Sequence, residues 1–388
     1  MQLRNSKCEQ RKFCKLPAPQ KMLKSISLQN FRNYKHKTFE FSPDTTLIIG
    51  PNTTGKTNIL EAVFLISTGK SFKTDKDFQM LEFGKEVGRV GAYVNPSASS
   101  AGSSQASSEQ VAKLEVVITN GNVSGVKSQY KKFLVNGVAK RRVDFAGNLI
   151  SVLFSPQDLD IIVDSPGLRR RFLDNVLEQV DREYRAANIA YVKAIRQRNA
   201  LLELAREKGI KNDKQFEYWD NLVIENGQVI TQKRQDFIDF VSKSPKDILE
   251  FILIYDKSVI SRQRLDQYKT EEIASAVTLV GPHRDDFSVL MTDKKDTHDV
   301  KYFGSRGQQR LAILQLKSCE ILFIEEKVGQ KPLLLLDDIF SELDSGHINL
   351  VLEKAGNQQT VLTTTHQEFV PKTLLKKMEV IELGENGN

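Results

Sequence analysis

The sequence predicts an α/β nucleotide-binding core that carries a smaller helical arm. Two observations predict the core. A glycine-rich phosphate-binding pattern, GPNTTGKT at residues 50–57, stands between an apolar strand and a helix, and a run of four leucines, PLLLLDD, ends in two aspartates. The arm is predicted because the chain from about 167 to 275 is rich in Leu, Ala, Glu, Arg, Gln and Lys and poor in glycine. At 388 residues, 40% of them hydrophobic, the chain is long enough for two domains.

The composition gives no sign of a secreted or membrane protein. No stretch of eighteen apolar residues is present, and the N-terminus lacks the apolar central region of a secretory signal. The three cysteines, Cys8, Cys14 and Cys319, form neither a disulfide framework nor a zinc-binding spacing. These features are typical of a reducing compartment, and we expect a cytoplasmic protein without a membrane span.

The net charge of +7 is concentrated at the N-terminus. Residues 1–21 carry six Lys or Arg residues and one Glu, so they account for +5 of this charge. The stretch has no helical or strand period, which predicts a disordered basic extension, and Met22 is an alternative start of the translated chain. Because the rest of the chain is close to neutral, any nucleic-acid site has to be inferred from local clusters.

Residues 22–165 are expected to form the N-terminal part of the core. Leu23, Ile26 and Leu28 fit a strand, DTTLIIG is a second apolar strand, and NILEAVFLIST has helical character. The Ser/Ala/Gly-rich stretch near 95–110 cannot build a core, and we interpret it as an insertion between strands. Asn136-Gly137, between two strand-like runs, is the favoured pair of a type I′ hairpin.

The arm is predicted to occupy residues 166–275. Ser165 can cap its first helix, and Pro166 suits the first helical position. The heptads are too short and irregular for a long coiled coil. Residues 276–388 then complete the core, with strands expected in TLVGPHRDDFSVLM, KPLLLLDD, QQTVLTTT and MEVIEL.

The glycine-rich loop fits the pattern G-x-x-x-x-G-K-[ST]. In such a loop, backbone N–H groups and the helix N-terminus bind phosphates, a lysine (Lys56) neutralises the β and γ oxygens, and a hydroxyl (Thr57) joins the Mg²⁺ shell. The alternative is a glycine turn that merely precedes a helix. The predicted nucleotide-binding residues here are Gly50, Pro51, Asn52, Thr53, Thr54, Gly55, Lys56 and Thr57.

Polar residues follow other predicted strands at the same sheet edge. Asp337 and Asp338 end the leucine strand, where open α/β sheets bind ligands. Asp337 is predicted to hold Mg²⁺ and Asp338 to orient or deprotonate an attacking water; alternatively, the pair is a polar strand end. His366, in VLTTTHQ, is predicted to sense the γ-phosphate, with a structural histidine as the alternative. Gln157, in FSPQDLD, is a candidate to link Mg²⁺ to the arm, and its spacing favours neither outcome.

A second glycine-bearing turn, YFGSRGQQR at 302–310, precedes a helical run. Four residues of this run recur at helical spacing and predict one buried face: Ala312, Leu316, Cys319 and Phe323. SRGQQ then lies at a helix N-terminus, which favours an anion. Since the first loop fills its own phosphate site, this turn suggests a nucleotide held by a second copy of the chain in a symmetric dimer. An entry turn to a core helix is the alternative.

Together these motifs resemble the RecF family, ABC-type ATPases of the SMC-like class. The resemblance extends from about Met22 to near the C-terminus and implies a P-loop ABC-type ATPase head with a smaller helical arm. The motifs that carry it are NFRNY at 30–34, the P-loop followed by NILEA, SPQDLDIIVDSPGLRRRFLD, GPHRDD at 281–286, SRGQQR, LLLLDDIFSELD and TTTH.

The resemblance implies roles for several residues. Ser305, Gly307 and Gln308 resemble the signature that contacts the ATP of the opposite subunit. SELD, around Asp344, resembles the loop that crosses the dimer interface. Arg32 and Asn33 resemble positions near the adenine or ribose.

Two residues depart from the family pattern. Thr53 stands where the family usually has glycine, and a β-branched residue there costs free energy if φ is positive. Arg306 stands where the signature usually has glutamine. It either strengthens the contact with a γ-phosphate or points to solvent.

The resemblance also implies a weakly hydrolytic ATPase that dimerises on ATP, binds single-stranded and gapped DNA, and works with RecR and RecO to load RecA. Any DNA contacts should be phosphate contacts that are sensitive to salt. Each candidate cluster is otherwise a solvated face. His283 and Arg284 of GPHRDD either brace the arm or contact nucleotide. The candidate DNA-binding residues are Lys131, Lys132, Lys140, Arg141, Arg142, Arg169, Arg170 and Arg171.

Three other functions are compatible with a P-loop and a signature. A transporter-type ATPase subunit is disfavoured by the long insertion between the two motifs and by the lack of a membrane segment. A structural, SMC-like DNA tether is disfavoured because long heptad arms are lacking. A defence ATPase with a nuclease is disfavoured because no room remains for a nuclease domain.

Overall fold

The computed structural model describes residues 21–96, 111–209, 213–293, 296–341, 358–370 and 375–384, together with 346, 348 and 351. The basic extension before residue 21, most of the Ser-rich insertion near 95–110, and Asp344 lie outside the described residues.

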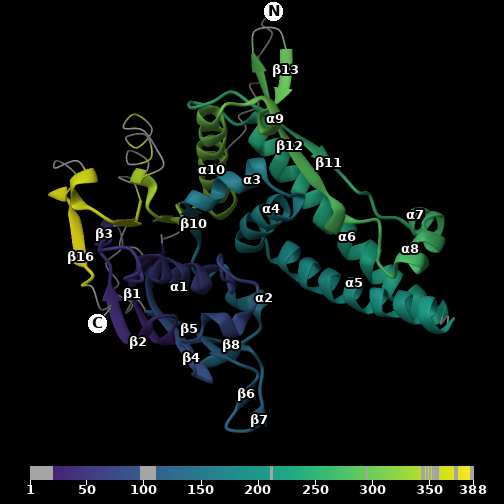
Figure 1. Ribbon diagram of the computed structural model, residues 1–388, viewed down its shortest axis with the longest axis horizontal. Coiled ribbons are helices and arrows are strands. Elements are labelled where there is room, and N and C mark those ends of the chain that lie inside the picture. The colour runs from purple at the N-terminus through teal and green to yellow at the C-terminus, as the bar shows by residue number, and fades with distance from the viewer. Residues whose placement is uncertain are drawn as a thin grey trace, which may run out of the picture.

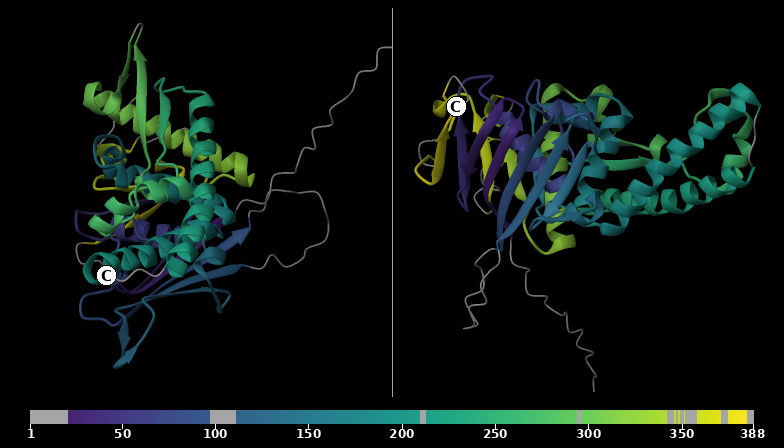
Figure 2. Two further views of the ribbon diagram at one scale, coloured as in Figure 1. Left: turned by 90° about the vertical axis from the view of Figure 1, so that its right-hand side faces the viewer. Right: turned by 90° about the horizontal axis from the view of Figure 1, so that it is seen from below.

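The core lobe consists of one helix, α1 (Lys56–Thr68), between two β-sheets (Figures 1 and 2). Apolar residues surround α1 on both sides, including Leu60, Val63 and Phe64, and all three are buried. A helix that is hydrophobic all round has to be covered on every face, and the two sheets provide that cover.

One sheet is antiparallel, with the order β2-β1-β4-β5-β8-β9. Its strands are β1 (Lys21–Phe31), β2 (Tyr34–Glu40), β4 (Val87–Pro96), β5 (Ala112–Thr119), β8 (Lys131–Val135) and β9 (Val138–Lys140). The predicted type I′ turn joins β8 to β9, with φ of 51° at Asn136 and 78° at Gly137. The other sheet is parallel, with the order β10-β14-β15-β3-β16. Its strands are β3 (Thr45–Ile49), β10 (Ser151–Phe154), β14 (Leu333–Leu336), β15 (Thr360–Thr364) and β16 (Met378–Glu382).

The second face of the parallel sheet packs against α10 (Arg306–Val328). Leu314, Ile321 and Ile324 of α10 join the leucines of β14 in one buried cluster. The opposite face of α10 contacts the arm, where all four residues of the predicted apolar face are buried: Ala312, Leu316, Cys319 and Phe323. Because α10 is buried on two faces, it connects the core lobe with the arm.

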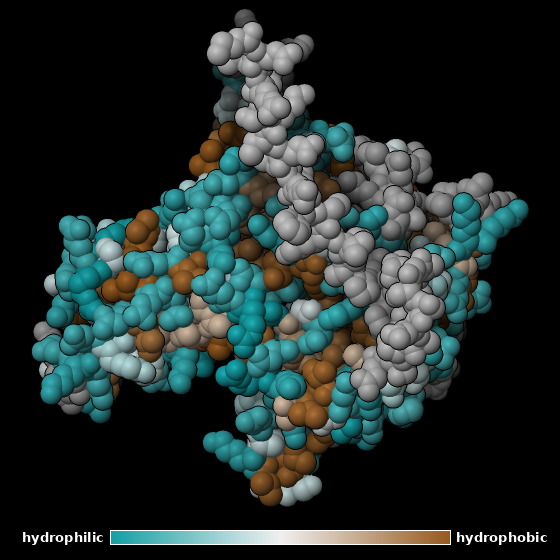
Figure 3. All heavy atoms as spheres, turned by 180° about the vertical axis from the view of Figure 1, so that it is seen from behind, coloured by the Kyte–Doolittle hydropathy of each residue, from teal (hydrophilic) through white to brown (hydrophobic). Residues whose placement is uncertain are grey.

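The arm extends away from the two sheets (Figures 1 and 2). Ser165 precedes α4 and Pro166 is its first residue, as predicted, although the Ser165 side chain makes no capping hydrogen bond. The two long helices of the arm, α5 and α6, have 27 and 31 residues. Seen from behind, its surface is largely hydrophilic with scattered apolar residues (Figure 3). The arm contains α4 (Pro166–Val180), α5 (Arg182–Lys208), α6 (Asp213–Lys243), β11 (Ile252–Asp256), α7 (Arg262–Gln267), α8 (Lys269–Ser275), β12 (Asp286–Asp293) and β13 (Asp296–Asp299).

The arm differs from the predicted helical segment in one respect. β11 pairs with β12, and β12 pairs with β13, in a three-stranded antiparallel sheet. Phe287 and Val289 of β12 belong to the same buried cluster as the arm helices. The arm therefore continues beyond residue 275, the predicted boundary, because strands that follow it in sequence complete the arm's own core.

The mixed α/β class and the separate arm are confirmed. No helix in the described part of the chain is long and apolar enough to cross a membrane.

Candidate nucleotide-binding site

Four parallel strands bring the predicted site residues to one edge of the sheet. The register pairs Phe154 with Leu336, Leu336 with Leu362, and Thr364 with Ile49. The turns that follow these strands carry Gln157, Asp337 and Asp338, His366 and the P-loop. Because parallel strands end at the same edge, segments more than 300 residues apart in sequence meet there.

The P-loop residues lie directly before α1, as predicted. Gly55 has φ of 102°, and a Cβ on it would lie 2.6 Å from the Asn33 side chain, so only glycine fits. Thr53 has φ of 75°, which is the strained conformation expected where the family has glycine. Lys56 is buried, and its Nζ donates to the carbonyls of Gly50 and Pro51 at 2.6 and 2.9 Å. Burial lowers the pKa of Lys56, and the carboxylates of Asp338 and Asp337 oppose this shift.

Thr57 and Asp337 are in direct contact. Thr57 Oγ1 donates to Asp337 Oδ1 at 3.0 Å, and Thr363 Oγ1 of β15 donates to the same oxygen at 2.8 Å. Burial raises the pKa of Asp337, and the two hydroxyls oppose this shift. A carboxylate and a hydroxyl are oxygen ligands that suit Mg²⁺, so this pair fits the predicted metal site.

Asp338 follows Asp337 in a left-handed conformation, with φ of 48°. Its backbone N–H donates to Thr363 Oγ1 at 3.0 Å, so β15 fixes the orientation of the turn. Thr363, the first residue of the TTTH motif, therefore holds both aspartates of this strand end, a role that the sequence analysis did not assign to it.

Arg32 and Asn33 flank the loop in different ways. Asn33 Nδ2 donates to the Thr54 carbonyl at 3.1 Å, so it supports the P-loop from outside. Arg32 makes a bidentate ion pair with the buried Glu61 of α1, at 2.8 and 2.6 Å. The guanidinium of Arg32 thus anchors α1 to the loop after β1.

Lys73 is a further cation beside the site that the sequence patterns did not reveal. Its Nζ donates to Asn58 Oδ1 at 2.9 Å, one residue beyond Thr57. Burial lowers the pKa of Lys73, and Glu61 and Asp337 oppose the shift. The residue lies in a loop without a recognisable pattern, so its position could be found only from the fold.

His366 and Gln157 occupy the sheet edge with exposed side chains. His366 lies two residues beyond the end of β15, directly before the short helix η5 (Gln367–Phe369). Gln157 lies in the turn η2 (Pro156–Leu159) after β10. The position of His366 agrees with its predicted placement at the carboxyl end of a strand. The strand before Gln157 was not predicted, and the structure places this residue at the same edge.

The signature-like turn begins α10. Ser305 caps the helix: its Oγ accepts from the Gln308 N–H at 3.2 Å, while Gln308 Oε1 accepts from the Ser305 N–H at 2.8 Å. Gly307 is exposed, and a Cβ on it would meet only Ser305 Oγ, at 3.9 Å. Among the residues that the structure describes, nothing therefore requires glycine at this position.

Comparisons with known proteins agree with this geometry. The family model described as "RecF/RecN/SMC N terminal domain" matches residues 22–386. A DNA replication and repair protein RecF from Moorella thermoacetica is 34% identical over 377 residues, covering 94% of this chain and 95% of that protein. The chain belongs to the RecF family. A RecF from Lachnoclostridium phytofermentans is 35% identical, covering 90% of this chain and 94% of the relative.

Solved RecF structures share this fold along most of the chain. A structure described as the recombination mediator protein RecF with ATP, in the RecFOR pathway, has a TM-score of 0.79 and 31% identity, and covers 91% of this chain and 94% of that one. A second RecF structure, described with the ATP analogue ATPrS, has a TM-score of 0.78 and 30% identity, and covers 92% of this chain and 95% of that one. The RecF assignment therefore rests on both sequence and fold.

The candidate DNA-binding residues of this RecF-family chain divide into two groups. Lys132, Lys140 and Arg141 are exposed on or directly beside the β8–β9 hairpin. Of these three, Arg141 also pairs with Asp144 at 3.2 Å. The other five are buried or half-buried and contact the protein itself. Arg169 is buried and pairs with Asp286 at 2.6 and 3.0 Å, while Arg142 makes two bonds of 2.9 Å to the buried Glu178. Both residues were predicted as DNA contacts, with a solvated face as the alternative. Carboxylates distant in sequence pair with them instead, so neither guanidinium group lies on a solvated face.

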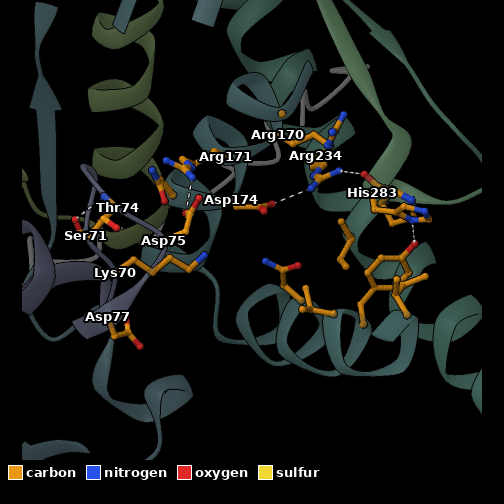
Figure 4. A pocket seen from close by; sticks show the side chains of 18 of the residues that line it. Lys70, Ser71, Thr74, Asp75, Asp77, Arg170, Arg171, Asp174, Arg234 and His283 are labelled. Carbon is orange, nitrogen blue, oxygen red and sulfur yellow. Dashed lines mark hydrogen bonds and ion pairs between the residues drawn. The ribbon is translucent and has the colours of Figure 1, made fainter. Parts of the chain in front are cut away.

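The remaining three cations lie along a cleft of about 560 Å³ between the core lobe and the arm (Figure 4). Lys131 pairs with Asp77 at 2.7 Å, and Arg171 pairs with Asp75 at 2.5 Å. Arg170 donates to the Asp285 carbonyl at 2.7 Å. Of these contacts, Arg171–Asp75 ties the arm to the loop after α1, whereas the other two lie within the core lobe and within the arm.

The GPHRDD motif braces the arm. Asp285 is buried and accepts from Arg234 of α6 at 3.1 Å, while Asp286 holds Arg169 of α4. His283 Nδ1 lies 2.7 Å from the Tyr191 hydroxyl of α5, and burial lowers the pKa of His283 to about 4. Of the two roles left open by the sequence, these contacts favour bracing.

Proposed function

We propose that this RecF-family protein is an ATP-switched DNA-binding protein of recombination and repair, in which two copies bind ATP between them. The observation that carries the proposal is Gly307. It lies exposed in the first turn of α10, beside the cap, and the described part of its own chain gives no steric reason for a glycine there. A glycine with that freedom suits close approach by a phosphate from outside the subunit.

The residues at the sheet edge fit ATP and Mg²⁺. The P-loop N–H groups and Lys56 would bind the phosphates, and Thr57 with Asp337 would hold the metal, with Gln157 as a third candidate ligand. A bound Mg²⁺ neutralises negative charge on the β and γ phosphates. Asp338 is suited to accept a proton from water, and His366 to contact the terminal phosphate. The relatives described with ATP and an ATP analogue support this assignment.

The second subunit would supply Ser305, Gly307 and Gln308 to the same nucleotide. In a symmetric dimer each signature turn faces the partner's P-loop, so two nucleotides are enclosed together. Slow hydrolysis of ATP would then separate the two subunits. This arrangement makes ATP the switch between the monomeric and dimeric forms.

DNA is the proposed partner of the ATP-bound form, with gapped or single-stranded regions as the target. Lys132, Lys140 and Arg141 are the cations best placed for phosphate contacts, because their side chains are exposed. DNA as the partner is supported by the relatives, which are described as DNA replication and repair proteins. One solved structure is described within the RecFOR pathway, and on this basis we propose RecR and RecO as further partners. The proposed role of the protein on DNA is to help load RecA.

A structural DNA tether fits the arm less well. The longest arm helix, α6, has 31 residues and so spans about 46 Å. Its residues Val223, Ile230 and Phe237 are buried within the arm's own core. The arm thus closes on itself and does not continue as a coiled coil.

Solution mass by light scattering tests the proposal. We would measure the wild type with and without a non-hydrolysable ATP analogue and Mg²⁺, together with Lys56→Ala, Ser305→Arg and Gly307→Gln. Gly307→Gln retains the Ser305 cap and replaces glycine with a better helix former, so it should not weaken α10. Lys327→Ala, at the far end of α10, is the control.

We expect the wild type and the control to double in mass only with nucleotide. Lys56→Ala should stay monomeric because it binds nucleotide poorly. The two signature variants should bind nucleotide and still stay monomeric. If Gly307→Gln dimerises like the wild type, the turn is only a helix entry and the shared-site proposal is wrong.

A further inference from the structure

The cleft of about 560 Å³ between the core lobe and the arm is separate from the nucleotide site (Figure 4). Among the described residues, its lining includes neither the P-loop nor Asp337 and Asp338. It is formed instead by the loop after α1, the first residue of β8, the helices α4, α5 and α6, and the GPHRDD motif. A cavity of this volume lies in the range of small-molecule sites, which is roughly 300–1,000 Å³.

Arg170 is a cation of the cleft that is only partly satisfied. In the described part of the chain its guanidinium makes one hydrogen bond, from Nη1 to the Asp285 carbonyl at 2.7 Å, and no ion pair. The side chain is half-buried, and burial together with the nearby Arg234 lowers the pKa of Arg170. A half-buried guanidinium whose direct acceptor is neutral is stabilised further when an anion binds it.

Arg171 is a second cation in the lining of the cleft. It pairs with Asp75 at 2.5 Å, and the Asp75 side chain is 82% exposed. An ion pair with such an exposed partner contributes little free energy, so Arg171 readily exchanges it for a contact with a ligand. Arginine is also the side chain best suited to phosphate, because its planar group donates two parallel hydrogen bonds.

Carboxylates line the same cleft and limit the kind of anion that fits. Asp174 accepts from the Tyr184 hydroxyl and from Arg234 at 2.8 Å, and within the described chain both bonds end on Oδ1. Its Oδ2 therefore remains to accept from a hydroxyl group of a ligand. Asp75 and Asp77 also line the cleft. A DNA backbone would bring successive phosphates against these carboxylates, whereas a single nucleotide brings one phosphate group and sugar hydroxyls.

The wall of the cleft at α5 is apolar and uncharged. Val192 of α5 is 50% exposed, and Ile195 of α5 and Ile230 of α6 also line the cleft. His283 completes this wall, and burial lowers the pKa of His283 to about 4, so its ring is neutral at pH 7. An apolar wall without charge suits the flat ring of a nucleobase.

We propose that this cleft is a second nucleotide site, which binds one ribonucleotide with its phosphate at Arg170 and Arg171, a ribose hydroxyl at Asp174 and its base against Val192. The inference goes beyond the proposed function and depends neither on ATP at the P-loop nor on the dimer. Because the core lobe and the arm both line the cleft, a bound ribonucleotide stabilises their arrangement.

Titration calorimetry with the 5′-monophosphates of adenosine, guanosine, cytidine and uridine tests the site. These probes lack the β and γ phosphates that a P-loop binds, and Lys56→Ala excludes the P-loop as their site. Arg170→Gln removes the cation, and Val192→Glu places a carboxylate on the apolar wall. The matched controls are Arg196→Gln and Ile189→Glu, at exposed positions of α5 outside the lining of the cleft.

We expect at least one of the four ribonucleotides to bind the wild type and Lys56→Ala with equal affinity and one site per chain. Arg170→Gln and Val192→Glu should each raise its Kd about tenfold, because one loses a charge-assisted hydrogen bond and the other repels the ligand. The two controls should retain the wild-type Kd. The matching 2′-deoxynucleotide, which lacks one hydroxyl, should bind about threefold more weakly.

Three results would overturn the inference. The first is that none of the four ribonucleotides binds at millimolar concentration. The second is binding that both cleft variants leave unchanged, which would place the ribonucleotide elsewhere on the protein. The third is that the cleft variants weaken binding of a single-stranded DNA oligonucleotide and not of the ribonucleotide, which would make the cleft a DNA site.

Discussion

Thr53 is the residue at which the phosphate-binding loop stores conformational strain. Its φ of 75° disfavours a β-branched side chain by about 1 kcal/mol or more. We therefore expect Thr53→Gly to raise the free energy of unfolding by about 1 kcal/mol in the absence of nucleotide, measured by chemical denaturation.

Thr54→Gly is the matched control for this change. Thr54 is buried, has no positive φ, and donates from Oγ1 to the Pro51 carbonyl at 3.0 Å. Its replacement by glycine should lower stability by about 1 kcal/mol. Equal effects of the two substitutions would show that the strain at Thr53 has no energetic consequence.

At this scale the sequence predicts residues whose role depends on their neighbours in the chain. The P-loop and the acidic pair Asp337-Asp338 follow from short patterns, and the structure brings them together. Arg169 could not be predicted, because its partner Asp286 is 117 residues away. A run of three arginines indicates charge but does not show which of them a distant carboxylate will bury.

At the scale of elements, one carboxylate of α4 joins three other parts of the molecule. These are α5, α2 (Arg142–Phe145) and the end of α1. Glu178 is 1% exposed and binds Arg142, Lys70 and Asn188. Burial alone would raise its pKa, but Lys70 and Arg142 outweigh burial and hold the pKa at about 2, below the ordinary 4.5. This fall corresponds to stabilisation on the order of 3 kcal/mol.

The sign of this shift predicts a pH dependence. A carboxyl group with a lowered folded-state pKa stabilises the protein above its unfolded pKa, and the stabilisation is lost as pH falls from about 4.5 to about 2. We expect the free energy of unfolding of Glu178→Gln to be about 3 kcal/mol below that of the wild type at pH 7. This difference should become smaller below pH 4.5. Chemical denaturation of both proteins across pH 3–7 measures the difference. A difference in free energy of unfolding that does not change with pH would contradict the prediction.

The order and type of most core elements were predictable, whereas β2, β10 and the limit of the arm were not. Apolar runs bounded by turn residues identified β3, β14, β15 and β16. β11 was missed because it lies inside a segment of helical composition, and its pairing with β12 depends on a contact across the predicted boundary at residue 275. Strand pairing of this kind is set by tertiary packing and not by local propensity.

For the whole molecule, the distribution of charge decides how DNA would be held. Most of the net charge lies in residues 1–21, and several inner cations are neutralised by ion pairs. The exposed hairpin cations Lys132 and Lys140 therefore remain as candidates within the folded part of the chain. Arg141 remains as well, because its ion pair with Asp144 leaves its side chain 79% exposed. The N-terminal extension is a second, separate source of positive charge.

Salt titration of DNA binding distinguishes these two sources. Each cation that no longer neutralises a phosphate should reduce the slope of log affinity against log salt by about 0.9. With ATP analogue present, Lys132→Ala, Lys140→Ala and Arg141→Ala combined should reduce the slope by about 1 to 3. The charge-matched control set Lys24→Ala, Lys35→Ala and Lys37→Ala lies on β1 and β2, away from the hairpin in the strand order, and should leave the slope unchanged. Removal of residues 1–20 should lower the affinity for DNA equally with and without nucleotide.

If only this truncation changes the slope of log affinity against log salt, the prediction for the hairpin is wrong. The hairpin is then a solvated face, and the folded lobes contact DNA elsewhere.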